Sequence, residues 1–119
     1  MSAHSFTTKD YFAHMLDAAT QILTYIDGRS IDDFFEDRYL QDAVIRNIEI
    51  LGEAARRLLA VDPDIQSKYQ DIPFVAIYGM RNQLSHGYFA IDFHVVATVV
   101  EKDIPLLKHE LEAAIKQMQ

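Results

Sequence analysis

The chain has 119 residues and a formal net charge of −7, from 11 Lys and Arg against 18 Asp and Glu. Half of its residues are hydrophobic and it has only four Gly and three Pro, which excludes a disordered chain and disfavours an all-β domain rich in turns. It has no Cys, which excludes disulfides, a thiolate zinc site and a cysteine nucleophile. At this length a single domain over residues 1–119 is expected.

The acidic balance and the N-terminal sequence restrict the expected partners and location. A protein that coats nucleic acid by neutralising phosphates normally carries a basic surplus, so the net charge leaves room only for a local basic pocket. The longest apolar run, residues 95–100, is too short to span a bilayer, and the first five residues do not read as a signal peptide. We therefore expect a soluble cytoplasmic protein with no membrane partner, and its modest core favours an oligomer.

The N-terminal third of the chain carries two helix-start signals. Thr7-Thr8-Lys9-Asp10 combines a capping hydroxyl with an acidic residue in the first turn, and apolar residues then repeat at helical spacing over residues 12–26. Gly28 is a typical C-terminal stop. Ser30 and Asp33 match a capping box, which predicts the start of a second helical segment.

A long helix is predicted next, over residues 40–59, and the Asp62-Pro63 pair ends it. One side of this helix is an apolar stripe, and the other side carries Arg46, Glu49, Glu53, Arg56 and Arg57. Gly52 interrupts the helix at a cost of about 1 kcal/mol relative to alanine. Either close packing, as at a dimer contact, compensates this cost, or the glycine is simply tolerated.

The C-terminal half predicts two or three more helices. One starts at Asp71-Ile72-Pro73 and ends at Gly87. Another is capped by Asp92 and runs through the valines of residues 95–100. Pro105 either kinks this helix or separates it from a last one with leucines at helical spacing. The sequence therefore predicts an all-α fold, an up-down bundle of four to five helices.

No metal-binding motif stands out in the sequence. The acidic cluster of residues 32–37 offers oxygen ligands for magnesium, but acidic residues also favour a helix N-terminal turn, and this second interpretation is preferred. The five histidines form no H-E-x-x-H pattern, and a polar contact on one helical face explains His14 beside Asp10 and Asp17. Phosphate-loop and hydrolase-elbow motifs are absent. We predict neither a metal site nor a cofactor.

One short segment concentrates chemistry on an otherwise apolar stretch. It brings together five different functional groups within eight residues, on Arg81, Asn82, Ser85, His86 and Tyr88. Arginine suits phosphate recognition and histidine moves protons near neutral pH, although the same residues also suit a helix C-terminus. On a continuous helix Arg81 and His86 are about 140° apart. A shared site therefore needs the helix to end between them or a second subunit to complete it.

This segment resembles a known motif. Arg81-Asn82-x-x-x-His86-Gly87-Tyr88 is similar to the R-x4-H-x-Y motif of HepT-like proteins, in the HEPN superfamily of toxin ribonucleases. Residues 42–55, which contain the run Gly-Glu-Ala-Ala, resemble that family's second long helix, and Ile72-Pro73-Phe74 resembles its lead into the motif helix. Phe74 departs from the family, which often has Trp there. The resemblance covers most of the chain and implies one HEPN/HepT-like helical domain.

The resemblance implies a metal-independent endoribonuclease that acts as the toxin of a toxin–antitoxin system. His86 would be the general base on the ribose 2′-hydroxyl, Arg81 would stabilise the charge on the phosphorane, and Asn82 would orient the pair or the phosphate. The products would carry a 2′,3′-cyclic phosphate and a 5′-hydroxyl. The family forms homodimers whose motifs meet in a shared cleft, so RNA and a second copy are the implied partners.

The resemblance also implies a regulator and leaves one alternative function. The cognate antitoxin would be an MNT-type nucleotidyltransferase that attaches AMP to Tyr88, and the added phosphate would repel an RNA backbone. The alternative is a non-catalytic helical subunit of a nucleotidyltransferase complex, which binds a nucleotide or a partner and cuts nothing. The intact Arg81, His86 and Tyr88 favour the ribonuclease, whereas the acidic net charge favours the alternative.

Overall fold

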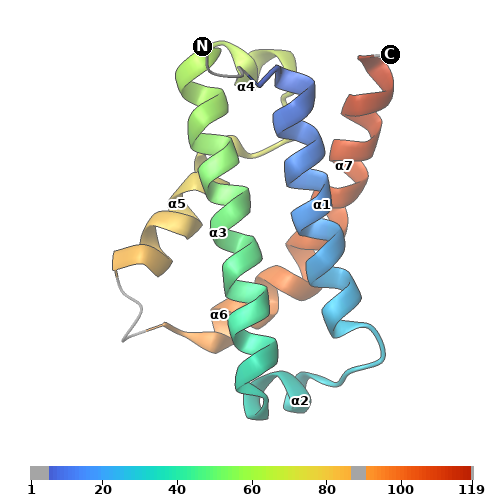
Figure 1. The fold of residues 1–119 in the computed structure, drawn as a ribbon, viewed down its shortest axis with the longest axis vertical. Helices are drawn as coiled ribbons and strands as arrows, with labels where there is room; N and C mark the ends of the chain where they lie inside the picture. The colour runs from blue at the N-terminus through green and yellow to red at the C-terminus, as the bar shows by residue number, and fades with distance from the viewer. Residues whose placement is uncertain (1–5, 87–90, 119) are drawn as a thin grey trace, which may run out of the picture.

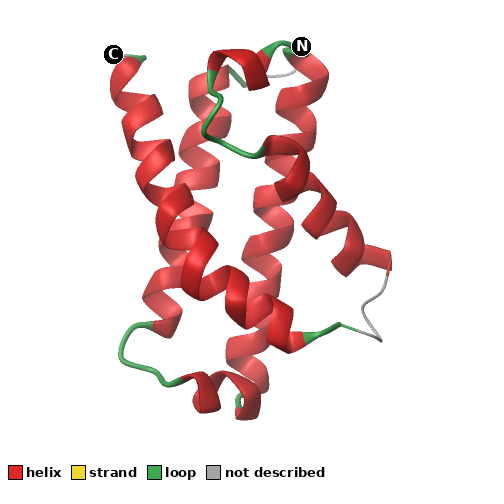
Figure 2. Ribbon diagram, turned by 180° about the vertical axis from the view of Figure 1, so that it is seen from behind, coloured by secondary structure: helices red, strands yellow, loops and turns green. Residues whose placement is uncertain are grey.

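The computed structural model describes residues 6–86 and 91–118, and within these ranges every regular element is helical (Figure 1, Figure 2). The elements in chain order are α1 (Thr8–Ile26), α2 (Ile31–Glu36), α3 (Arg38–Val61), α4 (Ile65–Lys68), α5 (Phe74–His86), α6 (Phe93–Thr98), the π-helical turn η2 (Val99–Asp103) and α7 (Ile104–Gln117). None of the helices in the described ranges is long and apolar enough to cross a membrane. The predicted all-α class is confirmed, and the expected helices correspond to α1, α3, α5 and the α6–α7 column.

The first two helices begin at the capping boxes that the sequence predicts. In α1, the Asp10 N–H donates to Thr7 Oγ1 (3.1 Å) and the Thr7 N–H donates to Asp10 Oδ2 (2.8 Å). Ser30 and Asp33 make the same reciprocal pair at the start of α2, at 3.1 and 2.9 Å. Between the two helices Gly28 adopts φ +73°, a left-handed conformation that other residues rarely adopt. Local residue chemistry therefore sets these boundaries.

Helix α1 lies between α3 and α7, and α5 packs on the other side of α3 (Figure 1). The apolar stripes of α1, α3 and α7 form the core. Phe12 of α1 is fully buried and packs edge-on against Tyr69, with ring centroids 5.0 Å apart, and stacks with Phe74 at 6.0 Å. These rings fix the connection between α4 and α5 against α1, and so fix where the motif helix starts.

Helix α5 begins just after the Asp-Ile-Pro triplet at which the sequence predicts its start. The carbonyl of Pro73 accepts the Ile77 N–H at 3.0 Å, so Pro73 precedes the helix. The Gln66 side chain donates to the Ile72 carbonyl (2.8 Å) and accepts from the Phe74 N–H (3.3 Å). These backbone groups between α4 and α5 therefore find hydrogen-bond partners although the segment is not helical. The sequence does not predict α4, because its four residues are too few to show a periodic pattern.

Helices α6 and α7 are joined by a π-helical turn rather than a loop, so the ribbon bends without interruption (Figure 2). Pro105 occupies the first turn of α7, a position at which a missing N–H is tolerated. The Ile104 N–H reaches back five residues to the carbonyl of Val99, as in a π-helix. Pro105 therefore marks a kink in one helical column, the first of the two alternatives that the sequence leaves open.

Candidate functional site

The predicted site residues Arg81, Asn82 and His86 all lie on α5. Arg81 is partly exposed and Asn82 is exposed. The described part of α5 runs through His86 without a break after Arg81, so the alternative in which the helix ends between the two residues is wrong, and they remain about 140° apart around one helix axis. The His86 side chain and Tyr88 lie outside the described part of the structure.

Gly52 allows α5 to approach α3 closely at Arg81. A Cβ built on Gly52 would overlap the Cβ of Arg81, and it would lie 2.5 Å from the Arg81 Cγ and 3.2 Å from the Arg81 Cα. Gly52 is buried at this crossing. Close packing therefore accounts for this glycine, as one sequence alternative predicts, but the packing partner is α5 of the same chain.

Glu53, the next residue on α3, gathers three arginines. Its carboxylate accepts hydrogen bonds from Arg56 Nε and Nη2 (3.1 and 2.9 Å) and from Arg57 Nε (2.9 Å), and Arg81 Nη2 lies 3.8 Å from its Oε1. The hydrogen bonds from Arg56 and then Arg57 outweigh partial burial and lower the pKa of Glu53 to about 2. The same bonds raise the pKa of both arginines. Glu53 is therefore ionised at neutral pH.

The contact between Glu53 and Arg81 is the loosest of the three. A separation of 3.8 Å makes an ion pair but is too long for a hydrogen bond, and the side chains of Arg81 and Glu53 are 31% and 33% exposed. Exposed pairs of this kind contribute about 0–1 kcal/mol. Glu53 therefore keeps the Arg81 guanidinium nearby without binding it firmly. An incoming anion can take up the N–H donors of Arg81 at little cost.

Arg81 lines a polar groove of about 320 Å³ between α1, α3 and α5. The charged residues of this groove are Arg46, Glu49, Glu53, Arg57 and Arg81. Three arginines against two glutamates give 3 − 2 = +1, whereas the whole chain carries −7. The other lining residues are Tyr11, His14, Ile50 and Ala54. The groove is therefore a local positive feature on an acidic protein, of the kind that attracts anions.

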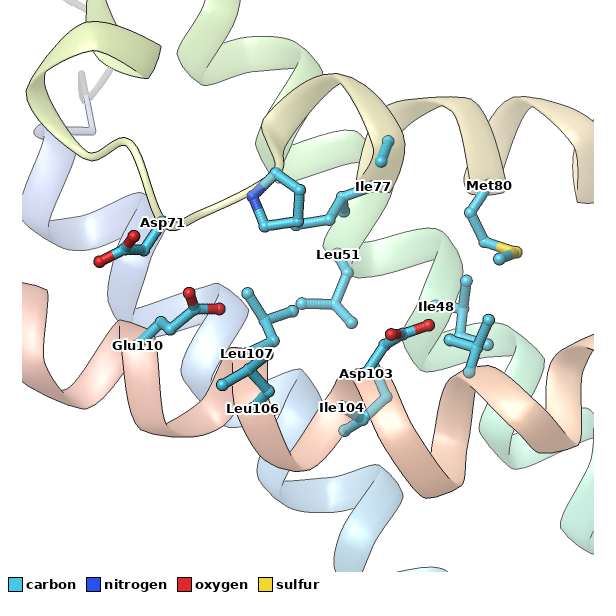
Figure 3. A pocket seen from close by; sticks show the side chains of 13 residues that line it. Ile48, Leu51, Asp71, Ile77, Met80, Asp103, Ile104, Leu106, Leu107 and Glu110 are labelled. Carbon is cyan, nitrogen blue, oxygen red and sulfur yellow. The ribbon is translucent and has the colours of Figure 1, made fainter.

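A second groove, of about 350 Å³, lies between α5 and the η2–α7 segment (Figure 3). Its lining is mostly apolar, and Figure 3 shows among others Leu51 and Met80 pointing into it. Three carboxylates belong to the same groove, those of Asp71, Asp103 and Glu110. Burial and the nearby charge of Asp71 raise the pKa of Glu110. An acidic and apolar groove of this kind does not suit a phosphate group.

The acidic cluster of residues 32–37 serves the ends of helices. Asp33 completes the capping box of α2 by accepting the Ser30 N–H (2.9 Å), and Asp37 accepts the Leu40 N–H at the start of α3 (3.2 Å). Asp37 also pairs with Arg29 at 2.7 Å, and this hydrogen bond lowers the pKa of Asp37. Across the described ranges, no three His, Asp or Glu side chains are grouped so that they could hold a metal ion.

The sequence alone does not connect the arginines of α3 with the motif on α5. Arg46, Glu49, Glu53 and Arg57 are spaced three or four residues apart, which places them on one helical face, and this signal is visible in the sequence. Sequence periodicity does not show which neighbours border that face. The structure places it between Arg81 of α5 and His14 of α1.

The fold and the groove define an all-helical domain that presents an arginine-lined polar surface along its central helix. The family model described as "Ribonuclease HepT-like" matches residues 15–114, and the chain belongs to this HepT-like ribonuclease family. The resemblance inferred from the R-x4-H-x-Y motif is therefore confirmed.

Three relatives illustrate the family. The chain is 39% identical over 110 residues to "Gamma-glutamylcyclotransferase and putative RNase" of Methanocaldococcus jannaschii. The aligned residues make up 92% of this chain and 48% of the relative. It is 35% identical over 104 residues to "Probable ribonuclease HepT" of Thermococcus cleftensis, and the aligned residues make up 87% of this chain and 92% of the relative. It is 31% identical over 112 residues to a "Putative RNase" of Caldanaerobacter subterraneus, covering 94% of each. The chain thus spans about half the length of the first relative and nearly all of the other two. No solved structure matches the chain significantly.

Proposed function

We propose that this chain is the toxin of a toxin–antitoxin system and that it cleaves RNA as a metal-independent endoribonuclease. The observation that carries the proposal is the partly exposed Arg81 guanidinium, which lies 3.8 Å from Glu53 beside a groove of local positive charge. Membership of the HepT-like ribonuclease family and the names of the relatives support it. RNA is the proposed substrate, and the reaction uses no cofactor.

The proposed mechanism is an internal phosphoryl transfer within RNA. His86 takes the proton of a ribose 2′-hydroxyl, and the 2′-oxygen attacks the adjacent phosphorus. The bond between phosphorus and the 5′-oxygen breaks, the leaving 5′-oxygen takes a proton from water, and His86 afterwards releases to solvent the proton it took from the 2′-hydroxyl. Arg81 stabilises the charge on the phosphorane, and Asn82 orients the phosphate. The products carry a 2′,3′-cyclic phosphate and a 5′-hydroxyl.

The test is cleavage of RNA in the presence of EDTA. The wild-type chain should cut RNA, whereas an oligonucleotide with a 2′-deoxyribose at the cleaved position should stay intact because the nucleophile is missing. His86→Ala and Arg81→Ala should each lower the rate by about a hundredfold or more. Loss of activity in EDTA, or full activity in both variants, would show that this mechanism is wrong.

We propose that the site is completed in a homodimer. Arg81 and His86 lie about 140° apart on one unbroken helix, so two copies of α5 that face each other can combine Arg81 of one with His86 of the other. Mixing inactive Arg81→Ala with inactive His86→Ala tests this directly. Random exchange of subunits should restore about a quarter of the wild-type activity, since half of the dimers are mixed and each mixed dimer has one intact site. A monomer in light scattering, or no recovery on mixing, would contradict the shared site.

The proposed regulation is AMPylation of Tyr88 by an MNT-type nucleotidyltransferase antitoxin. The adduct would carry a phosphate into the neighbourhood of the motif and compete with RNA for Arg81. Tyr88→Phe should keep ribonuclease activity but escape the antitoxin, so that coexpression no longer rescues growth. Mass spectrometry should find AMP on the wild-type chain and none on the variant. An unmodified Tyr88 beside an effective antitoxin would instead indicate neutralisation by binding alone.

A second candidate function is that of a non-catalytic subunit that binds a partner in a nucleotidyltransferase complex. The observation that favours it is the apolar groove of Figure 3, where Leu106 is 57% exposed and three carboxylates would attract a basic partner. In that case Leu106→Asp should abolish copurification with the nucleotidyltransferase, and no RNA should be cut. Cleavage that depends on Arg81 and His86 would exclude this alternative.

A further inference from the structure

We infer that the polar groove beside Arg81 binds the backbone of single-stranded RNA next to the cleaved phosphate, with Arg46 and Arg57 contacting phosphates and His14 contacting a base. The inference deepens the proposed function and rests on it for the identity of the ligand. It adds substrate-binding residues on α1 and α3 to those of the motif helix α5.

Arg46 and Arg57 keep guanidinium donors that no acceptor among the described residues takes up, although Arg57 gives some of its own to Glu53 and Tyr11. Arg46 is exposed, lines the groove and makes no hydrogen bond or ion pair among those residues. Arg57 gives Glu53 only its Nε–H, and its side chain is 53% exposed. A guanidinium has five N–H donors, so Arg57 retains free donors beside those directed to Glu53 and Tyr11. Arginines with open donors on a groove suit phosphate oxygens, which they can bind in a bidentate manner.

The arginines are spaced along the groove as a strand of RNA would require. Arg46 and Arg57 are eleven residues apart on α3, which corresponds to a rise of about 16 Å. Arg81 joins the same groove from α5. A backbone that follows α3 can therefore reach Arg46, Arg57 and Arg81 through different phosphates.

Aromatic rings stand at the α1 side of the groove. His14 is exposed and lines it, and its ring lies 5.3 Å from that of Phe6, in edge-to-face geometry. Phe6, 46% exposed, also contacts the ring of Tyr11 at 5.6 Å. Proteins that bind single strands combine a positive groove with rings on which bases stack. The combination of rings and arginines favours a single strand over a duplex, whose bases are already stacked.

The small net charge of the groove suits weak, reversible binding of a substrate. One reason that the charge is small is Glu49, which is partly buried in the groove, makes no ion pair among the described residues and therefore opposes phosphate binding. With a balance near +1 the groove can bind RNA transiently, which a nuclease needs in order to release its products, rather than coat it.

The experiment measures the binding of a fluorescent single-stranded 2′-O-methyl RNA, which lacks the attacking hydroxyl, by anisotropy at several salt concentrations. Arg46→Gln and Arg57→Gln should each weaken binding about tenfold and lower the slope of log affinity against log salt by about 0.7. Arg38→Gln is the matched control, because it removes the same charge from the same helix, at a side chain that is 90% exposed and outside the groove. His14→Ala should weaken binding without changing the slope.

The outcomes separate this inference from the proposed function. Equal affinities for Arg46→Gln, Arg57→Gln and Arg38→Gln would overturn the inference, even if the wild-type chain cleaves RNA. Selective loss of binding in the two groove variants would support it, even if no RNA is cut and the proposed nuclease activity fails. Because Arg57 also bonds Glu53, its variant is compared with the wild type in thermal unfolding, and Arg46→Gln decides the result if Arg57→Gln unfolds.

Discussion

Replacing Gly52 with alanine tests whether the contact between α3 and α5 is as close as the structure shows. On helix propensity alone, Gly52→Ala should stabilise α3 by about 1 kcal/mol, because glycine loses more backbone entropy than alanine in a helix. The new methyl group, however, would occupy space already filled by Arg81. The two effects have opposite signs, so their magnitudes decide the outcome.

The steric cost should exceed the gain in propensity. The added Cβ would overlap the Arg81 Cβ and lie 3.2 Å from its Cα, atoms that cannot move without moving the backbone of α5. Overpacking of this kind costs about 1–3 kcal/mol, and a contact near the backbone belongs at the upper end. Subtracting the gain of about 1 kcal/mol leaves a net loss of about 1–2 kcal/mol, or a fall in Tm of roughly 5 °C for a domain of this size.

Gly79 provides the matched control on the other helix of the pair. A Cβ built on Gly79 of α5 meets no atom within 4 Å, and this residue has no positive φ. Gly79→Ala should therefore stabilise the protein by about 0.5–1 kcal/mol. The assay is urea unfolding followed by far-UV circular dichroism, with the ribonuclease rate measured in parallel. If Gly52→Ala is as stable as the wild type, or gains stability as Gly79→Ala does, the close approach of α3 and α5 at Arg81 is wrong.

Because the pKa of Glu53 falls to about 2 from an ordinary 4.5, its ionised form stabilises the fold above pH 4.5, and this contribution is lost as the pH falls towards 2. Glu53→Gln should thus cost about 1–2 kcal/mol at pH 7, discounted because a third of the side chain is exposed, and much less at pH 2, where about half of Glu53 is protonated, as measured by urea unfolding at both pH values. Glu49→Gln should tighten binding of 2′-O-methyl RNA by a few fold, since it removes a like charge from the groove; unchanged or weaker binding would argue against a phosphate path there. Phe12→Ala should cost about 3–5 kcal/mol, because the ring is fully buried between Tyr69 and Phe74, and a loss below 1 kcal/mol in the same assay would contradict that packing.

Local signals in the sequence are enough to predict where several of the helices begin and where the first one ends. Thr7, Ser30 and Asp92 each cap a helix through a hydrogen bond between residues two or three apart, so the signal and the structure it causes lie in the same few residues. Gly28 ends its helix for an equally local reason, its left-handed φ. The R-x4-H-x-Y spacing is local too, which is why the family could be inferred before any packing was known.

The assembly of the candidate site depends on contacts between residues far apart in the sequence. Gly52 and Arg81 are 29 residues apart in the sequence, and nothing in the pattern around either one indicates that they meet. The periodicity of α3 places Arg46, Glu53 and Arg57 on one face but is silent on which helices border it. Those neighbours depend on how the apolar stripes of α1, α3 and α5 pack together, which is a property of the whole bundle. The loose hold of Glu53 on Arg81 and the groove beside it therefore exist only once α5 has packed against α3.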